Sequence, residues 1–302
     1  MTKAKLTLGP LLFNWPADTY RDFYARIADE APVDRVFLGE VVCSKREPFH
    51  EDVLIEAMER LEAAGKTVVL STLALVTLKR ERAQVQTTAK DAPGLVEAND
   101  VSAVGALAGK PHVIGPLINT YSEGTLRFFA GNGAETVCLP PELPLASVRV
   151  LAETGRESGC DIEVFAFGRV PLAVSARCYH ARVEGLAKDS CQFVCELDPD
   201  GRDVDTLDDQ KFLAINGIQT MSQSWANLAA DIPVLLEAGV TSFRLSPHSC
   251  DMVAVSRCFR DVLDGALAPD EAMRQLAALA PDVSFSNGFL HDTAGAAYVA
   301  AE

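Results

Sequence analysis

The feature that most constrains the fold is an alternation, along the whole chain, of short apolar runs rich in β-branched residues with longer amphipathic segments. Eight of the short runs have the length and composition of buried strands. They are Leu6–Leu8, Arg35–Gly39, Thr67–Ser71, Leu95–Ala98, His112–Gly115, Thr136–Leu139, Ile162–Phe167 and Ser242–Ser246. Such alternation indicates a parallel sheet with crossover helices. Eight strands in this order predict an α/β fold of the (β/α)8-barrel type.

The length of 302 residues fits one such barrel, so we expect a single domain over residues 1–302. An open, doubly wound sheet is the competing fold. No Gly-x-Gly-x-x-Gly follows the first expected strand, however, and this argues against a dinucleotide-binding sheet.

One stretch interrupts the alternation. Residues 169–217 separate the seventh expected strand from a helix that we expect over Gln223–Ala238, before the eighth strand. Long insertions in compact domains usually carry function. This one begins at the carboxyl end of a strand, which is the face of a barrel that holds the active site.

Cysteine placement points to the same face. Three of the eight cysteines, Cys178, Cys191 and Cys195, lie in the insertion, and Cys43 follows the second expected strand. Both segments open at the carboxyl ends of strands, so four thiols can converge on one site. Cys250 also lies on this face and is the fifth candidate ligand, after these four cysteines. The others are expected to be packing residues: Cys138, Cys160 and Cys258.

Four converging thiolates suit zinc or an iron–sulfur cluster. Structural zinc sites usually contain paired Cys-x2-4-Cys motifs, whereas this set has only one close pair, Cys191 and Cys195. The spacing is therefore compatible with a 4Fe-4S cluster, with zinc as the second choice. Unliganded or reactive thiols remain an alternative, as does replacement of one thiol by His180 or His248.

The formal net charge is −15, which disfavours nucleic acid as a partner. No apolar run approaches the roughly 20 residues of a membrane-spanning helix. The N-terminal residues do not have the pattern of a secretory signal. We therefore expect a cytoplasmic protein, in a reducing compartment that disfavours disulfides.

Several sequence blocks resemble the collagenase-like peptidase family, and within it the iron–sulfur members of oxygen-independent ubiquinone biosynthesis. The resemblance extends from about residue 6 to residue 290. It is carried by Leu8-Gly-Pro10 with Trp15-Pro16, Leu38–Arg46, Leu70–Val76, Ser175–Cys178, Asn216–Ser222 and Arg244–Pro247. It implies a 4Fe-4S cluster on Cys43, Cys178, Cys191 and Cys195. It also implies a heterodimer with a UbiU-like homologue that hydroxylates a prenylated aromatic ubiquinone precursor, using a small organic hydroxyl donor.

The peptidase signature of that family is altered here. Its histidine, first cysteine and glycine are replaced by Phe167, Pro171 and Ala176. Peptidase activity is therefore not expected. A non-catalytic structural or electron-relay role beside the partner remains open, while RNA-base hydroxylation, known in other relatives, is disfavoured by the net charge.

Substrate-lining candidates lie at or just after the ends of the fourth to sixth expected strands: Glu97, Asn119, Tyr121 and Glu142. Asn119 and Glu142 have an alternative role as caps of the following helices. Arg177, beside Cys178, is a candidate for holding a carboxylate, and solvated surface charge is its alternative role.

Overall fold

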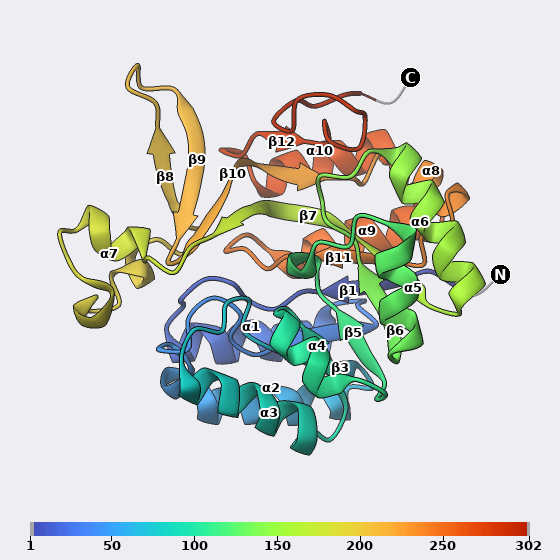
Figure 1. Ribbon diagram of the computed structural model, residues 1–302. Coiled ribbons are helices and arrows are strands. Elements are labelled where there is room, and N and C mark those ends of the chain that lie inside the picture. The colour runs from blue at the N-terminus through green and yellow to red at the C-terminus, as the bar shows by residue number, and fades with distance from the viewer. Residues whose placement is uncertain (1–2, 301–302) are drawn as a thin grey trace.

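The computed structural model describes residues 3–300 and contains a closed barrel of eight parallel strands (Figure 1). β1 pairs with β2, each following strand pairs with the next up to β7, and β11 closes the ring by pairing with both β7 and β1. The ring strands are β1 Lys5–Leu8, β2 Arg35–Leu38, β3 Thr67–Ser71, β4 Leu95–Ala98, β5 His112–Ile114, β6 Ala134–Cys138, β7 Asp161–Val174 and β11 Ser242–Leu245. The predicted barrel is confirmed.

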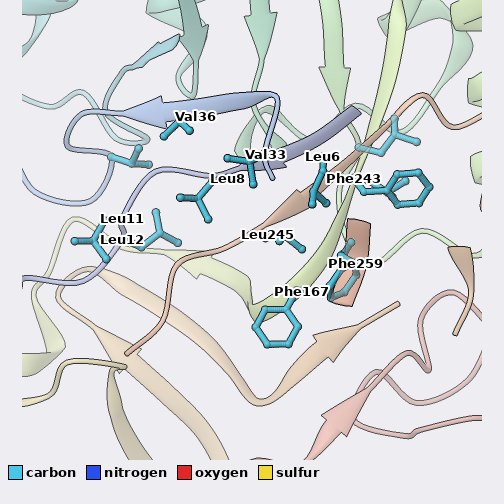
Figure 2. Close-up of a cluster of buried hydrophobic side chains, with 14 of the residues drawn as sticks. Leu6, Leu8, Leu11, Leu12, Val33, Val36, Phe167, Phe243, Leu245 and Phe259 are labelled. Carbon is cyan, nitrogen blue, oxygen red and sulfur yellow. The ribbon is translucent and has the colours of Figure 1, made fainter. Parts of the chain in front are cut away.

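Helices surround the ring because each has one apolar face. They are α1 Ala17–Glu30, α2 Glu51–Ala63, α3 Lys79–Asp91, α4 Val101–Leu107, α5 Glu123–Gly131, α6 Leu145–Ser158, α8 Ile232–Glu237, α9 Met252–Leu263 and α10 Pro269–Leu279. In α9, the Asp251 carboxylate caps the first turn by accepting from the Val253 and Ala254 amides. The buried face of α9 then packs on the barrel through Phe259 (Figure 2).

β7 departs most from expectation, because it continues seven residues beyond the predicted end at Phe167, to Val174. Its outer half pairs with β10 (Gln219–Asn227), which pairs with β9 (Lys211–Asn216), and β9 pairs with β8 (Arg202–Asp205). These strands and the short helix α7 (Tyr179–Val183) form an arm beside the barrel (Figure 1). We call residues 169–227 the arm.

The expected helix over Gln223–Ala238 is wrong in its first half. Trp225 to Asn227 pair with Arg169 to Phe167 of β7, and Trp225 and Ala226 also pair with β12 (Phe285–Ser286). Backbone partners on both sides stabilise an extended conformation more than the local helical pattern stabilises a helix. The helix begins only at Ile232.

A buried His–Asp pair fixes the arm to the barrel at the point where β7 leaves the ring. His248 Nε2 accepts from the Arg169 amide at 3.0 Å, and its Nδ1 lies 3.1 Å from Asp200 Oδ1. The ring stacks on Trp225, with 3.8 Å between centroids. Gly168 is required here: its φ is +113°, and a Cβ would lie 2.9 Å from His248 Nε2.

We predict that Asp200→Asn lowers the free energy of unfolding by about 1–3 kcal/mol at pH 7. Burial alone would raise the pKa of Asp200, but hydrogen bonds from His248 and Ser249 outweigh it and hold the pKa below its usual value. A lowered carboxyl pKa stabilises the fold above the unfolded pKa, and this contribution disappears as pH falls through the folded pKa. Urea unfolding at several pH values measures the free energy of unfolding of both proteins. The difference in this free energy between wild type and variant should decrease below about pH 4. Asp209→Asn, at an exposed position, is the control. A difference independent of pH would contradict the prediction.

Within residues 3–300, no helix has the length and apolar character needed to cross a membrane.

Candidate metal centre

Cys43 is presented by a tightly folded loop that follows β2. The Glu40 carboxylate accepts from the Val42 and Cys43 amides at 2.7 and 2.8 Å, and the Arg46 amide donates to the Cys43 carbonyl at 2.9 Å. The loop leaves the strand at Gly39, where φ is +117° and a Cβ would lie 2.8 Å from the Ser71 carbonyl oxygen. Only glycine fits this combination of conformation and close approach.

The other three cysteines of the expected set lie at the base of the arm. The amides of Ser175 and Tyr179 donate to the carbonyls of Ile218 and Gly217, which places Cys178 at the start of α7 beside the β9–β10 turn. Cys191 ends the 3-10 turn Lys188–Ser190, and Cys195 lies in the next turn, Val194–Leu197. The short turns between α7 and β8 return these thiols to the barrel side of the arm.

The structure brings all four thiols to one hollow. Cys43, Cys178, Cys191 and Cys195 line it together with Lys45, Arg46, His180, Lys188, Phe193, Val194, Gly217 and Ile218. Cys195 is buried, and the other three cysteines are partly buried. All eight cysteines lie within the described residues, and none forms a disulfide.

Three cationic side chains surround the thiols, and no carboxylate of the described chain lines the hollow. Arg46 is 1% exposed and donates hydrogen bonds to the Leu12 carbonyl and to Asn216 Oδ1. Its Nη1 lies 3.9 Å from Glu40 Oε1. Its Nε has no hydrogen-bond partner among the described residues. Lys45 Nζ lies 3.9 Å from Cys191 Sγ. A buried cation beside the thiols favours negative charge on the neighbouring sulfurs.

Burial has a larger effect than the Arg46 guanidinium on the pKa values of the two thiols nearest to it. It raises the pKa values of Cys43 and Cys195, while the guanidinium of Arg46 acts in the opposite direction on both. Both thiols are therefore protonated at neutral pH as they stand. A metal centre, which binds thiolates, would displace these protons.

Four thiols facing one hollow are a donor set for zinc or for a 4Fe-4S cluster. Among residues 3–300, no three His, Cys, Asp or Glu side chains meet closely enough to hold a single metal ion. A zinc ion needs its sulfurs at about 2.3 Å from one common point. A four-iron cluster distributes four thiolates over separate iron atoms.

The proposed substitute ligands are engaged elsewhere. His180 accepts from the Gly217 amide through Nδ1, and its Nε2 lies 3.1 Å from Asp198 Oδ2. His248 uses both ring nitrogens in fixing the arm to the barrel. Cys250 does not line the hollow, and its Sγ lies 3.7 Å from Met252 Sδ.

Glu97 lies inside the barrel and is fully buried. Arg244 binds it at 2.5 Å and also binds Glu163, while the Arg244 guanidinium lies 4.0 Å from the centre of the Phe37 ring. Glu97 and Arg244 face a small cavity at the carboxyl end of the barrel, which Pro171 also lines. Glu97 thus faces a different cavity from the four cysteines.

The remaining candidates are outside the cysteine hollow. Tyr121 is 49% exposed and donates a hydrogen bond to Glu142. Asn119 adopts a left-handed conformation at the end of the turn Pro116–Ile118. Neither Asn119 nor Glu142 caps the following helix, because Ser122 and Pro144 hold those positions. Arg177 is exposed and does not line the hollow.

Sequence reasoning missed Lys188, which lines the hollow and donates to the Ala176 carbonyl. Its position three residues before Cys191 was the available signal. It also missed a larger cavity on the other side of the Cys43 loop, which is lined by residues of both strands and helices.

Three solved structures resemble the fold at low sequence identity. An enolase from Agrobacterium radiobacter is 11% identical, with a TM-score of 0.36, over 53% of this chain and 44% of its own, so this chain spans less than half of its length. An endoxylanase from a sugarcane soil metagenome is 10% identical, with a TM-score of 0.45, and the match covers 82% of this chain and 86% of the endoxylanase chain. The tryptophan synthase α subunit of Campylobacter jejuni is 8% identical, with a TM-score of 0.41, over 90% and 95%.

Family membership is established by sequence. Residues 19–299, almost the whole described chain including the Cys43 loop and the arm, match Peptidase family U32. The chain therefore belongs to Peptidase family U32, the collagenase-like family.

Proposed function

We propose that this chain is a UbiV-type protein, the 4Fe-4S subunit of an oxygen-independent hydroxylase of ubiquinone biosynthesis. It would act as a heterodimer with a UbiU-like homologue on a prenylated aromatic precursor and a small organic hydroxyl donor. The observation that supports the proposal most is the hollow in which Cys43 meets the three cysteines of the arm among Lys45, Arg46 and Lys188. Free thiols in this number suit a cytoplasmic, reducing environment.

The chain's own residues have defined roles in this proposal. Cys43, Cys178, Cys191 and Cys195 would hold the cluster, which supplies one-electron chemistry when bound. Arg46 and Lys45 stabilise the negative charge of the thiolates and favour the reduced state. Phe193 and Ile218 line the hollow and supply apolar surface beside the thiols.

Peptidase chemistry is not supported at the signature positions. Phe167, at the histidine position, is fully buried and packs edge-on against Trp225 and Phe259. Figure 2 shows Phe167 beside Phe259. Pro171, at the first cysteine position, lies in β7. Neither side chain can act as a nucleophile or as a base.

The test is reconstitution under anaerobic conditions. The chain, co-purified with a UbiU-like partner, should hydroxylate a prenylated phenol when a hydroxyl donor is added, and mass spectrometry detects the product. Cys178→Ala should abolish turnover, whereas Cys258→Ala, on the outer helix α9, should retain it. Absence of turnover by a complex with full iron content would contradict the proposal.

An electron-relay role without substrate contact is the second candidate, favoured because neither Tyr121 nor Glu142 lines the cysteine hollow. Full activity of a complex that carries Glu142→Gln and Tyr121→Phe would favour it.

A further inference from the structure

A second cavity, separate from the cysteine hollow, has a volume of about 340 Å³. Its lining residues come from the carboxyl ends of β2 and β3 and from helices α1, α2 and α3. Its volume is within the range of small-molecule sites. We call it the β2–β3 cavity.

The β2–β3 cavity and the cysteine hollow share one wall, the loop from Gly39 to His50. Glu40, Glu47 and His50 of this loop line the cavity, whereas Cys43, Lys45 and Arg46 of the same loop line the hollow. The two sides are linked through Glu40, whose carboxylate accepts from the Cys43 amide and lies 3.9 Å from Arg46. A ligand in the cavity is therefore adjacent to the loop that carries a proposed cluster ligand.

The walls of the β2–β3 cavity are mainly apolar and aromatic. Aliphatic side chains supply much of the lining: Leu11, Leu38, Leu54, Leu70, Leu73 and Val85. Phe13 and Tyr20 add aromatic surface, and Tyr20 stacks on His50 with 5.1 Å between centroids. Such walls favour a ligand with an aromatic ring and an aliphatic substituent.

The carboxyl groups of this cavity disfavour anionic ligands. Glu40, Glu47 and Glu51 line it, and no lysine or arginine of the described chain does. Glu40 already has Arg46 and two amides as partners, so it does not require a ligand cation. Glu47 has only the side-chain amide of Gln84, which is a lining residue as well. Burial raises the pKa of Glu47 to about 7, so this carboxyl group is present in both forms at neutral pH. It can accept a hydrogen bond from a hydroxyl group or donate one to it.

We propose that the β2–β3 cavity binds an uncharged phenol with an aliphatic substituent, its ring against Phe13 and Tyr20 and its hydroxyl group on Glu47. This inference rests on the proposed function and extends it by assigning the aromatic substrate to a site on this chain. The anionic class of hydroxyl donors is disfavoured in the same cavity by its carboxyl groups.

The test is calorimetric titration of the anaerobically purified protein with three probes of one skeleton. They are 2-(3-methylbut-2-enyl)phenol, the same phenol with a carboxylate at position 4, and the same phenol with an aminomethyl group at position 4. We expect the uncharged phenol to bind and the carboxylate to bind at least tenfold more weakly. Tighter binding of the ammonium form, or equal binding of the carboxylate, would overturn the assignment to an uncharged ligand.

Variants locate the binding. Thr88→Trp fills the cavity from α3 and should abolish binding, whereas Thr87→Trp, on the exposed side of the same helix, should leave it unchanged. Glu47→Met keeps the side-chain length but removes the hydrogen-bonding carboxyl group, and it should weaken binding about tenfold. Unchanged binding in both Thr88→Trp and Glu47→Met would overturn the proposal.

Iron content, measured on each sample, separates this inference from the proposed function. Wild-type protein that lacks iron but binds the phenol in the β2–β3 cavity would contradict only the cluster. Protein with full iron content that does not bind the phenol would contradict only the assignment of the cavity.

Discussion

Cys43→Ala is expected to abolish the binding of iron and sulfide, although Cys43 is far in sequence from the other three cysteines. Wild-type protein purified without oxygen should contain about four iron and four sulfide per chain and should be brown. Removing one of four thiolates leaves an iron atom without a protein ligand in a hollow that only 12 residues line. We expect the cluster content to fall at least tenfold, measured by iron and sulfide analysis and by visible absorbance.

Cys250→Ala is the matched control. Cys250 is partly buried, as Cys43 is, and follows the last barrel strand, but its sulfur lies against Met252 outside the hollow. It should retain wild-type iron. A colourless wild-type protein with one zinc per chain would contradict the cluster, and full iron in Cys43→Ala would remove Cys43 from the ligand set.

Arg244→Met is expected to lower the free energy of unfolding by about 3–5 kcal/mol, the largest stability effect that we predict. Arg244 is 2% exposed and lies between two fully buried carboxylates, Glu97 and Glu163. Methionine keeps most of the side-chain length but leaves both carboxylates without their cation. The hydrogen bonds from Ser71 to Glu97 and from Thr7 to Glu163 cannot replace that charge.

Urea unfolding measures this effect, and two further variants define its cause. Arg156→Met removes an exposed ion pair with Glu153 and should have little effect on the free energy of unfolding. Adding Glu97→Gln and Glu163→Gln to Arg244→Met should recover part of the lost stability, because neutral amides tolerate burial better than carboxylates. If Arg244→Met and Arg156→Met cost the same, the buried charges do not determine the loss.

The barrel strands were predictable because burial on both faces favours continuous apolar runs, as in Val36–Leu38 of β2 and Val164–Phe167 of β7. The extension of β7 was not predictable. Pro171 normally ends or interrupts a strand, but here it lies at a shift in the register between β7 and β10. The pairing partner that accommodates this proline is about 50 residues away in sequence.

Within the site, the sequence shows the type of each residue but not the environment of its side chain. Glu97 lies near the carboxyl end of β4, as an active-site carboxylate often does, but its environment is set by Arg244, which is distant in sequence. Likewise, nothing in the local sequence around Glu40 and Glu47 indicates that these side chains line a cavity. They face a cavity only because α2 and α3 pack beside the ends of β2 and β3.

The sequence by itself determined the order of strands and helices, the barrel that follows from it, and the thiols available for a metal centre. Hydrophobic periodicity and residue type are local properties, and they do not depend on contacts between distant segments. Tertiary structure alone decided that the Cys43 loop meets the arm, that Arg46 is buried beside its thiols, and that a cavity lies on the other side of that loop. These arrangements depend on ring closure and on the antiparallel pairing of β7 with β10, which join segments that no local pattern relates.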